Sequence, residues 1–243
     1  MKQSFYLIAF TLVLFAACKK DNPTPVDNNN NGGGQLLCKY DTVYSSQPGT
    51  VIYAYDDKDR IAKITRILDG KETISSFAYT ANKVVMQSDD QTNQYFLNKN
   101  GFADTVLMDF KSFGNIQVYY TYNSQNQIVK QIQEMEIGGN ELYLEIENTY
   151  LNGNISSSKI LFDGDESIRV NEYHLDKQNS LKDMDYKIQF IPSNQNLMKA
   201  SYLDGNLTQS FIYQFDSQNR IKSFKIIDSE GKEQINSIVW KCK

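Results

Sequence analysis

The stretch YAYDDKDRIAK, residues 53–63, decides the fold because the same pattern recurs along the chain. It aligns without gaps on YTYNSQNQIVK at residues 120–130 and on YQFDSQNRIKS at residues 213–223, and residues 175–181 keep the spacing without the aromatic residues. Each copy places aromatic residues at alternate positions, which lie on one face of a β-strand. Turn-forming residues follow, and an aliphatic residue then restarts a strand. The repeat therefore predicts a series of β-hairpins.

Weaker copies of the pattern fill the intervals between the strong ones. Together the copies place strand restarts at positions 61, 84, 102, 128, 155, 181, 197 and 221. The intervals leave room for two strands each and for no helix, which gives about sixteen strands. Pairs such as Asp-Gly and Gly-Asn mark further tight turns within residues 68–71, 137–140, 162–165, 203–206 and 229–232. The predicted fold class is all-β, an antiparallel meander rolled or closed into a barrel-like sheet.

The copies resemble the tyrosine-aspartate (YD) repeats of Rhs-type proteins, whose pattern is Tyr-x-Tyr-Asp-x-x-Gly-Arg-Leu. Arg60-Ile61 and Arg220-Ile221 match that pattern well, while Asp59 and Asn219 stand where the family has Gly. The chain from residue 38 to residue 243 more closely resembles Bacteroidetes lipoproteins of unknown function with degenerate repeats of this kind. That resemblance implies a porin-like barrel or rolled sheet in the cell envelope, and it implies no activity.

The N-terminal segment is typical of a secreted protein. Residues 1–17 contain Lys2 as a positive start and an apolar run that is too short to span a bilayer comfortably. The run ends in Phe15-Ala16-Ala17-Cys18, which resembles the lipobox of bacterial lipoproteins, in which the cysteine is acylated. We therefore expect Cys18 to carry lipid; the alternative is an ordinary signal peptide that ends at a cysteine by chance.

Residues 18–34 are predicted to be a lipid anchor and a disordered tether, because their Pro, Asn and Gly content leaves too little apolar surface to fold. The stretch Cys18-Lys19-Lys20-Asp21 resembles surface-export signals of Bacteroidetes lipoproteins. We expect an outer-membrane location with membrane contact through the N-terminal lipid only, on the cell surface or on the periplasmic face. Residues 35–243 then form a single all-β domain.

Charge and cysteine usage narrow the function classes. Without residues 1–17 the chain has 24 basic against 29 acidic residues, since Lys2 is lost, so no basic field exists for nucleic acid. If Cys18 carries lipid, Cys38 and Cys242 are an even pair at the two ends of the domain in an oxidising compartment. We predict a disulfide between them, with two separate buried thiols as the alternative. Such a bridge favours closure of the sheet.

A membrane-spanning barrel is disfavoured by the strand sequences. Its outward positions would need an uninterrupted apolar band. Residues 61–68 and 221–227 instead carry Lys or Arg at more than one position. We expect the domain to be soluble.

No active site can be assembled from the sequence. His174 is the single histidine and is read as an ordinary histidine, so triads and zinc sites of the usual composition are excluded. We predict no catalytic residue, metal or cofactor. An alternative is a carboxylate-dependent hydrolase acting on glycans, which would need at least two of these acids in one pocket: Asp56, Asp89, Asp163 and Glu166.

The preferred function is a cell-envelope binding or interaction module for a glycan, a peptide or a partner protein. It would use a concave face or the barrel mouth. The paired aromatic residues of the repeat are assigned to the core, although aromatic faces also stack on sugars. Two triplets, Asp41-Thr42-Val43 and Asp104-Thr105-Val106, resemble the O-glycosylation sequon of exported Bacteroidetes proteins. They make Thr42 and Thr105 candidate glycosylation sites, and if modification occurs both are surface positions.

Overall fold

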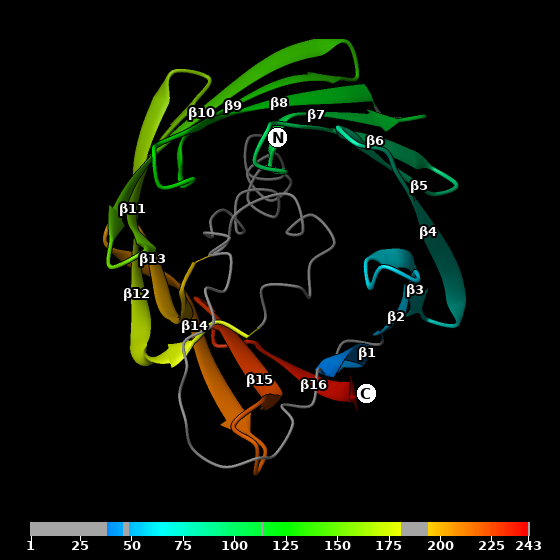
Figure 1. The fold of residues 1–243 in the computed structure, drawn as a ribbon. Coiled ribbons are helices and arrows are strands. Elements are labelled where there is room, and N and C mark those ends of the chain that lie inside the picture. Colours follow the sequence, from blue (N-terminus) through cyan, green and yellow to red (C-terminus); the bar gives the residue numbers. More distant parts are fainter. Residues whose placement is uncertain (1–37, 46–48, 113, 181–193, 243) are drawn as a thin grey trace.

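The chain folds into a closed barrel of sixteen antiparallel strands (Figure 1). The structure is a computed structural model that describes residues 38–45, 49–112, 114–180 and 194–242. The strands are β1 (Cys38–Ser45), β2 (Gly49–Tyr55), β3 (Ile61–Leu68), β4 (Lys71–Tyr79), β5 (Lys83–Gln87), β6 (Gln91–Leu97), β7 (Ala103–Phe110), β8 (Gly114–Tyr122), β9 (Ile128–Ile137), β10 (Asn140–Leu151), β11 (Asn154–Phe162), β12 (Asp165–Gln178), β13 (Asn196–Leu203), β14 (Asn206–Phe215), β15 (Ile221–Asp228) and β16 (Glu233–Cys242).

Every strand pairs with its neighbours in the chain, and β1 closes the barrel against β16. In this seam Val43 lies opposite Ile238, and the backbone of Cys38 lies opposite that of Cys242. Closure leaves no unpaired edge among the sixteen described strands, which removes the aggregation hazard of a long open meander. The predicted all-β meander and its closure are both confirmed.

The repeat places most strand starts correctly. Strands begin at Ile61, Ile128 and Ile221 as predicted, and the starts expected at 84, 102, 155 and 197 are off by one residue. Position 181 lies outside the described residues. The turn expected to open at residues 175–178 is wrong, because β12 continues to Gln178. Asn196 holds this extension in place by donating from its side-chain amide to two β12 carbonyls, at 3.1 Å each.

The two ends of the barrel differ in their connections. We name the end with the turns at residues 56–60, 98–102, 123–127 and 216–220 the repeat rim, and the opposite end the short-turn rim. The short-turn rim contains two-residue hairpins such as Asp69-Gly70 and Asp163-Gly164, in which both residues have positive φ. Positive φ at both central residues is the requirement of the type I′ turn that matches strand twist. The Asp-Gly turns predicted from the sequence are therefore confirmed.

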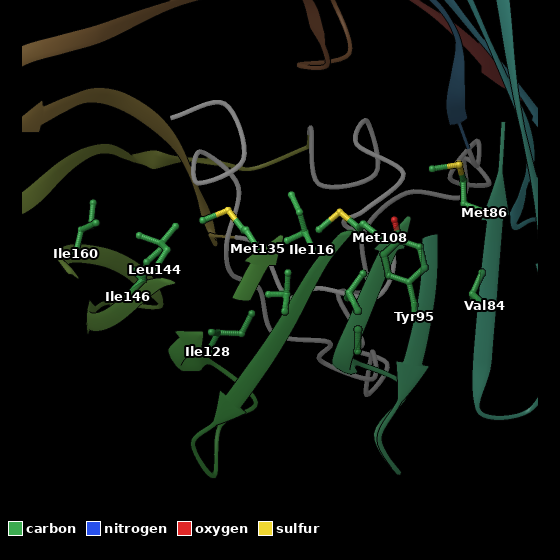
Figure 2. Packing of buried hydrophobic residues seen from close by; sticks show 13 residues of the cluster. Val84, Met86, Tyr95, Met108, Ile116, Ile128, Met135, Leu144, Ile146 and Ile160 are labelled. Carbon is green, nitrogen blue, oxygen red and sulfur yellow. The ribbon is translucent and has the colours of Figure 1, made fainter. Parts of the chain in front are cut away.

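Side chains alternate between an inner and an outer wall. On β9, Ile128 and Met135 are buried, whereas Glu134 and Glu136, which flank Met135, are exposed. Figure 2 shows buried residues of β5 to β11, among them Met86, Met108 and Met135, projecting toward the interior of the barrel. A second buried cluster lines β1 to β3, β13, β15 and β16. The apolar face of the meander is therefore the inner wall.

Candidate functional site on the inner wall

The turns of the repeat rim are built by their opening Asp or Asn. Asp56 Oδ1 accepts hydrogen bonds from the backbone amides of Lys58 and Arg60, at 2.9 and 2.8 Å. Asp59, two residues before the strand restarts, has a φ of 63°. A short polar side chain tolerates that left-handed conformation, which explains why Asp or Asn replaces the Gly of the resembling repeats. The same two hydrogen bonds are made at this rim by Asn98, Asn123 and Asp216, and at the short-turn rim by Asp228.

Two of these turns also contain an ion pair. Arg60 contacts Asp56 and Arg220 contacts Asp216, each with a closest N–O distance of 2.7 Å. Backbone and side-chain hydrogen bonds from Arg220 lower the pKa of Asp216. For Asp56, burial favours the neutral acid, but the hydrogen bonds from Arg60 outweigh it and lower the pKa. Both carboxylates are thus occupied in holding the turn.

The aromatic residues of the repeat hold neighbouring strands together near this rim. Tyr79 OH donates to the carbonyl of Ile61 at 2.7 Å, and Trp240 Nε1 donates to the carbonyl of Ile221 at 2.9 Å. Burial raises the pKa of Tyr79 to about 12. Equivalent bonds to the preceding strand come from Tyr55, Tyr122, Tyr150, Tyr173 and Tyr213. These aromatic residues serve the fold, as the core interpretation predicted.

The four acids of the hydrolase alternative are not brought together. Asp56 lies at the repeat rim, whereas Asp89 and Asp163 lie at the short-turn rim in the β5–β6 and β11–β12 turns, with β7 to β10 between them. Glu166 is on the outer wall and pairs with Lys159 at 2.8 Å. Asp163 and Glu166 share the β11–β12 hairpin, but Asp56 and Asp89 are not gathered with them in one site.

The other predicted positions have different outcomes. Cys18 lies outside the described residues, and Cys38 and Cys242 are cross-strand partners in the seam. The surface position predicted for Thr42 is wrong, because Thr42 is only 8% exposed, being packed in the barrel wall between Ile52 and Val239. Thr105 is half-buried on β7. His174 is half-buried, with its ring edge-on to Tyr213.

A polar patch on the inner wall was not predicted. Arg169 on β12 is only 5% exposed, and its cross-strand neighbours are Ser158 on β11 and Leu203 on β13. Two residues along β12, Asn171 lies opposite Ser201, which is fully buried. We name Ser158, Arg169, Asn171 and Ser201 the inner polar patch. Burial lowers the pKa of the Arg169 guanidinium, because an apolar wall disfavours the charged form.

Part of the hydrogen-bonding capacity of this wall is unused. Asn171 donates to the carbonyl of Ile155 at 3.2 Å, and Ser158 donates to Asn148 at 2.7 Å. Asn171 Oδ1, Ser201 Oγ and, on β9, Gln133 Oε1 are buried without a hydrogen-bond partner. Each such group costs about 1–3 kcal/mol if nothing satisfies it. An ordered water, an ion or a functional role can account for such groups in a folded protein.

The outer wall is strongly charged around β9 to β12. Glu145 alternates with the buried Leu144 and Ile146 along β10 and pairs with Lys130 of β9 at 2.5 Å. Glu141, Tyr143 and Glu147 lie on the same outer face. Hydrogen bonds from Lys130 and from Tyr143 lower the pKa of Glu145 and so favour its ionised form. Among the described residues, no helix is long and apolar enough to cross a bilayer.

The barrel is similar to solved structures from Bacteroides. A porin-like protein from Bacteroides uniformis ATCC 8492 matches with 14% sequence identity and a TM-score of 0.57, over 84% of this chain and 98% of that chain. A porin-like protein from Bacteroides vulgatus ATCC 8482 matches with 10% identity and a TM-score of 0.61, over 83% and 98%. No family model and no curated protein matches the chain. At these identities the likeness shows the fold, and it confirms the expected porin-like barrel.

Proposed function

We propose that the chain is a lipid-anchored protein of the outer membrane whose barrel binds a ligand in its interior and performs no catalysis. The observation that carries this function is the inner polar patch, where a buried cation and unused hydrogen-bonding groups face inward from adjacent strands. Sixteen strands also make a wide barrel. At about eight strands side chains alone fill the interior, and the diameter grows with strand number.

The outer wall supports a barrel that is surrounded by water. Glu141, Glu145 and Glu147 occupy three of four successive outward positions on the twelve-residue strand β10, with Tyr143 between the first two. A lipid-facing charge near the middle of a bilayer costs about 2–4 kcal/mol for a basic residue and less for an acidic one. A transmembrane barrel has an apolar outside and a polar lumen, and on β9 and β10 the present walls are arranged the other way round.

The proposed location in the cell envelope rests on the N-terminal sequence. Cys18 follows an apolar run and small residues, and the porin-like structures to which the barrel is similar come from Bacteroides. A Cys18→Ser variant should leave the membrane fraction and appear in the soluble fraction, with the same strand content by circular dichroism. A wild-type protein that is already soluble in the envelope would contradict the anchor.

The binding function can be tested on protein isolated from its own membrane. Native mass spectrometry should detect a bound small molecule on the wild type, and the double substitution Asn171→Ala with Ser201→Ala should remove it. Thr149→Ala with Ser157→Ala is the matched control, since these residues are cross-strand partners on the outer wall. Equal ligand content in all three proteins, or none in any, would overturn the proposal.

A further inference from the structure

We infer that the outer wall at the barrel seam rests on the surface of a phospholipid bilayer; this inference depends on the lipid anchor of the proposed function. Outward residues of β16 and of β1 to β4 form a surface that we name the seam face: Thr42, Tyr44, Thr50, Ile52, Thr65, Ile74, Ser237 and Val239. Its apolar members, Tyr44, Ile52, Ile74 and Val239, are each between 37% and 50% exposed. The seam face therefore presents apolar side chains to the outside of the barrel.

The seam face is continuous and uncharged. The register aligns one residue from each of its strands in a single row: Val239, Thr42, Ile52, Thr65 and Ile74. At the usual spacing of neighbouring strands this row is about 20 Å long. Beside the row, Tyr44 lies between Ser237 and Thr50. Apolar side chains that gather in one patch mark a contact surface, whereas scattered ones need no explanation.

Two exposed apolar residues elsewhere on the outer wall have charged cross-strand partners. Tyr143 of β10 lies opposite Glu134 of β9. Ile212 of β14 lies opposite Lys225 of β15. Contact of those regions with lipid would remove charged groups from water, which is costly. The seam face can make such a contact without this cost.

Charged residues border the seam face beyond the ends of its row. They are Lys39, Asp41, Lys63 and Lys241 towards the repeat rim, and Glu72 and Glu233 towards the short-turn rim. Lys39 pairs with Asp59 at 2.5 Å, and Asp41 accepts a hydrogen bond from Thr42 at 3.1 Å. A lysine at the border can lay its aliphatic stem along apolar surface while its ammonium group reaches a lipid phosphate. The border towards the repeat rim therefore suits the headgroup region.

The predicted tether selects the bilayer as the occupant of the seam face. β1 begins at Cys38, and the tether is predicted to join it to the acylated Cys18. A flexible chain of about twenty residues has a root-mean-square span of about 25 Å. The seam is therefore the part of the barrel that the anchor holds closest to the membrane.

The opposite side of the barrel favours the same orientation. β9 and β10 lie across the barrel from β1 and β16 (Figure 1). Their outward residues include Glu134, Glu141 and Glu145. Anionic lipids repel these carboxylates and attract the lysines at the border of the seam face. The barrel thus rests on the membrane by one side without crossing it, which adds a protein contact to that of the N-terminal lipid.

Two tyrosines of the outer wall provide a matched pair of reporters. Tyr44→Trp places an indole on the seam face, and Tyr143→Trp places one on the opposite side. The lipid-anchored protein is reconstituted in vesicles of phosphatidylethanolamine with a minor share of phosphatidylglycerol, whose brominated acyl chains quench tryptophan at short range. After subtraction of the wild-type emission from Trp240, Tyr44→Trp should be quenched at least about twofold more than Tyr143→Trp, since interfacial side chains lie about 5–10 Å into the headgroup region.

Ile52→Trp is a second reporter on the seam face, and it decides the question if circular dichroism shows that Tyr44→Trp does not fold. Equal quenching on the two sides of the barrel, whether strong or absent, would overturn the inference. A second copy on the seam face would protect the indole of Tyr44→Trp from brominated lipid and from aqueous iodide alike, and that result would also overturn it.

Flotation of the same vesicles reports on the anchor separately. Protein that floats without preferential quenching of Tyr44→Trp retains the anchor of the proposed function and loses the seam-face contact. Protein that does not float contradicts both.

Discussion

The two rims of the barrel are built in different ways. At the repeat rim, opening Asp or Asn residues bind two backbone amides, buried aliphatic residues such as Ile61 and Ile128 restart strands, and aromatic hydroxyls bind the neighbouring strand. At the short-turn rim most described hairpins turn on two residues of positive φ, and Leu68 is 58% exposed. The repeat therefore fixes one end through side-chain hydrogen bonds, whereas the other end depends mainly on the backbone geometry of its two-residue turns.

The largest effect is expected from the seam at the repeat rim. We propose that Cys38 and Cys242 form a disulfide, because cross-strand partners lie within the Cα separation that a disulfide requires. A bridge across about 200 residues is worth roughly 5 kcal/mol in the chain-entropy model. Cys242→Ser should lower the free energy of unfolding by up to that amount, measured with urea. Reduction of the wild type should give the same loss, and an unreduced, unfolded protein that reacts with a thiol reagent at both cysteines would contradict the bridge.

A second comparison uses one strand that reaches both rims. Ile128 at the repeat rim of β9 is fully buried, whereas Ile137 at its other end is only half-buried. Ile128→Ala should cost about 2–5 kcal/mol because it leaves a cavity. Ile137→Ala should cost about 1 kcal/mol because less apolar surface is lost. Equal losses in chemical denaturation would show that the two rims contribute alike.

Removal of one hydroxyl tests the hydrogen bonds that aromatic side chains donate to the neighbouring strand. Tyr79→Phe should cost about 1 kcal/mol, the usual net value of a hydrogen bond, since it deprives the Ile61 carbonyl of its donor. Tyr143→Phe, on the outer wall, should cost much less, because water can replace the exposed hydrogen bond that the Tyr143 hydroxyl donates to Glu145. The raised pKa of Tyr79, about 12 against an ordinary 10, means that its neutral form stabilises the fold below pH 10. That contribution should be lost as the pH rises from 10 through 12, and the Phe variant should lack this dependence.

The smallest effect is expected in the way the stability of the fold depends on low pH. Hydrogen bonds from Arg220 lower the pKa of Asp216, so the ionised form stabilises the fold above the ordinary value and this stability is lost as the pH falls through the lowered value. Asp216→Asn should retain the turn, because Asn123 makes the same backbone hydrogen bonds. The variant should therefore melt almost as the wild type does at pH 7 and should lose less stability on acidification. A steeper acid dependence in the variant would contradict this role.

The architecture was predictable because the turns are encoded locally. Asp56 and its counterparts fix each turn through bonds to residues two and four positions on, so a single sequence repeat reports both strand register and strand number. The extension of β12 was not predictable, because it depends on Asn196, a residue of the next strand.

The inner polar patch was missed for a physical reason. On β12 the apolar Ile168 and Val170 point outward, with 41% and 45% exposure, and Arg169 and Asn171 point inward. Ordinary alternation assigns aliphatic residues to the core, so the sequence of this strand indicates the wrong face. An Arg between two β-branched residues within a predicted strand was the signal that could have raised the question.

The central claim is that the charged wall faces water and the opposite wall faces the interior. In protein whose other cysteines are blocked, Glu145→Cys and Ile146→Cys place a thiol at successive positions of β10, one on each wall. A membrane-impermeant maleimide applied to the lipid-anchored protein in intact vesicles should label the first variant rapidly and the second only after unfolding. Rapid labelling at position 146 with protection at position 145 would be the pattern of a transmembrane barrel and would contradict the claim.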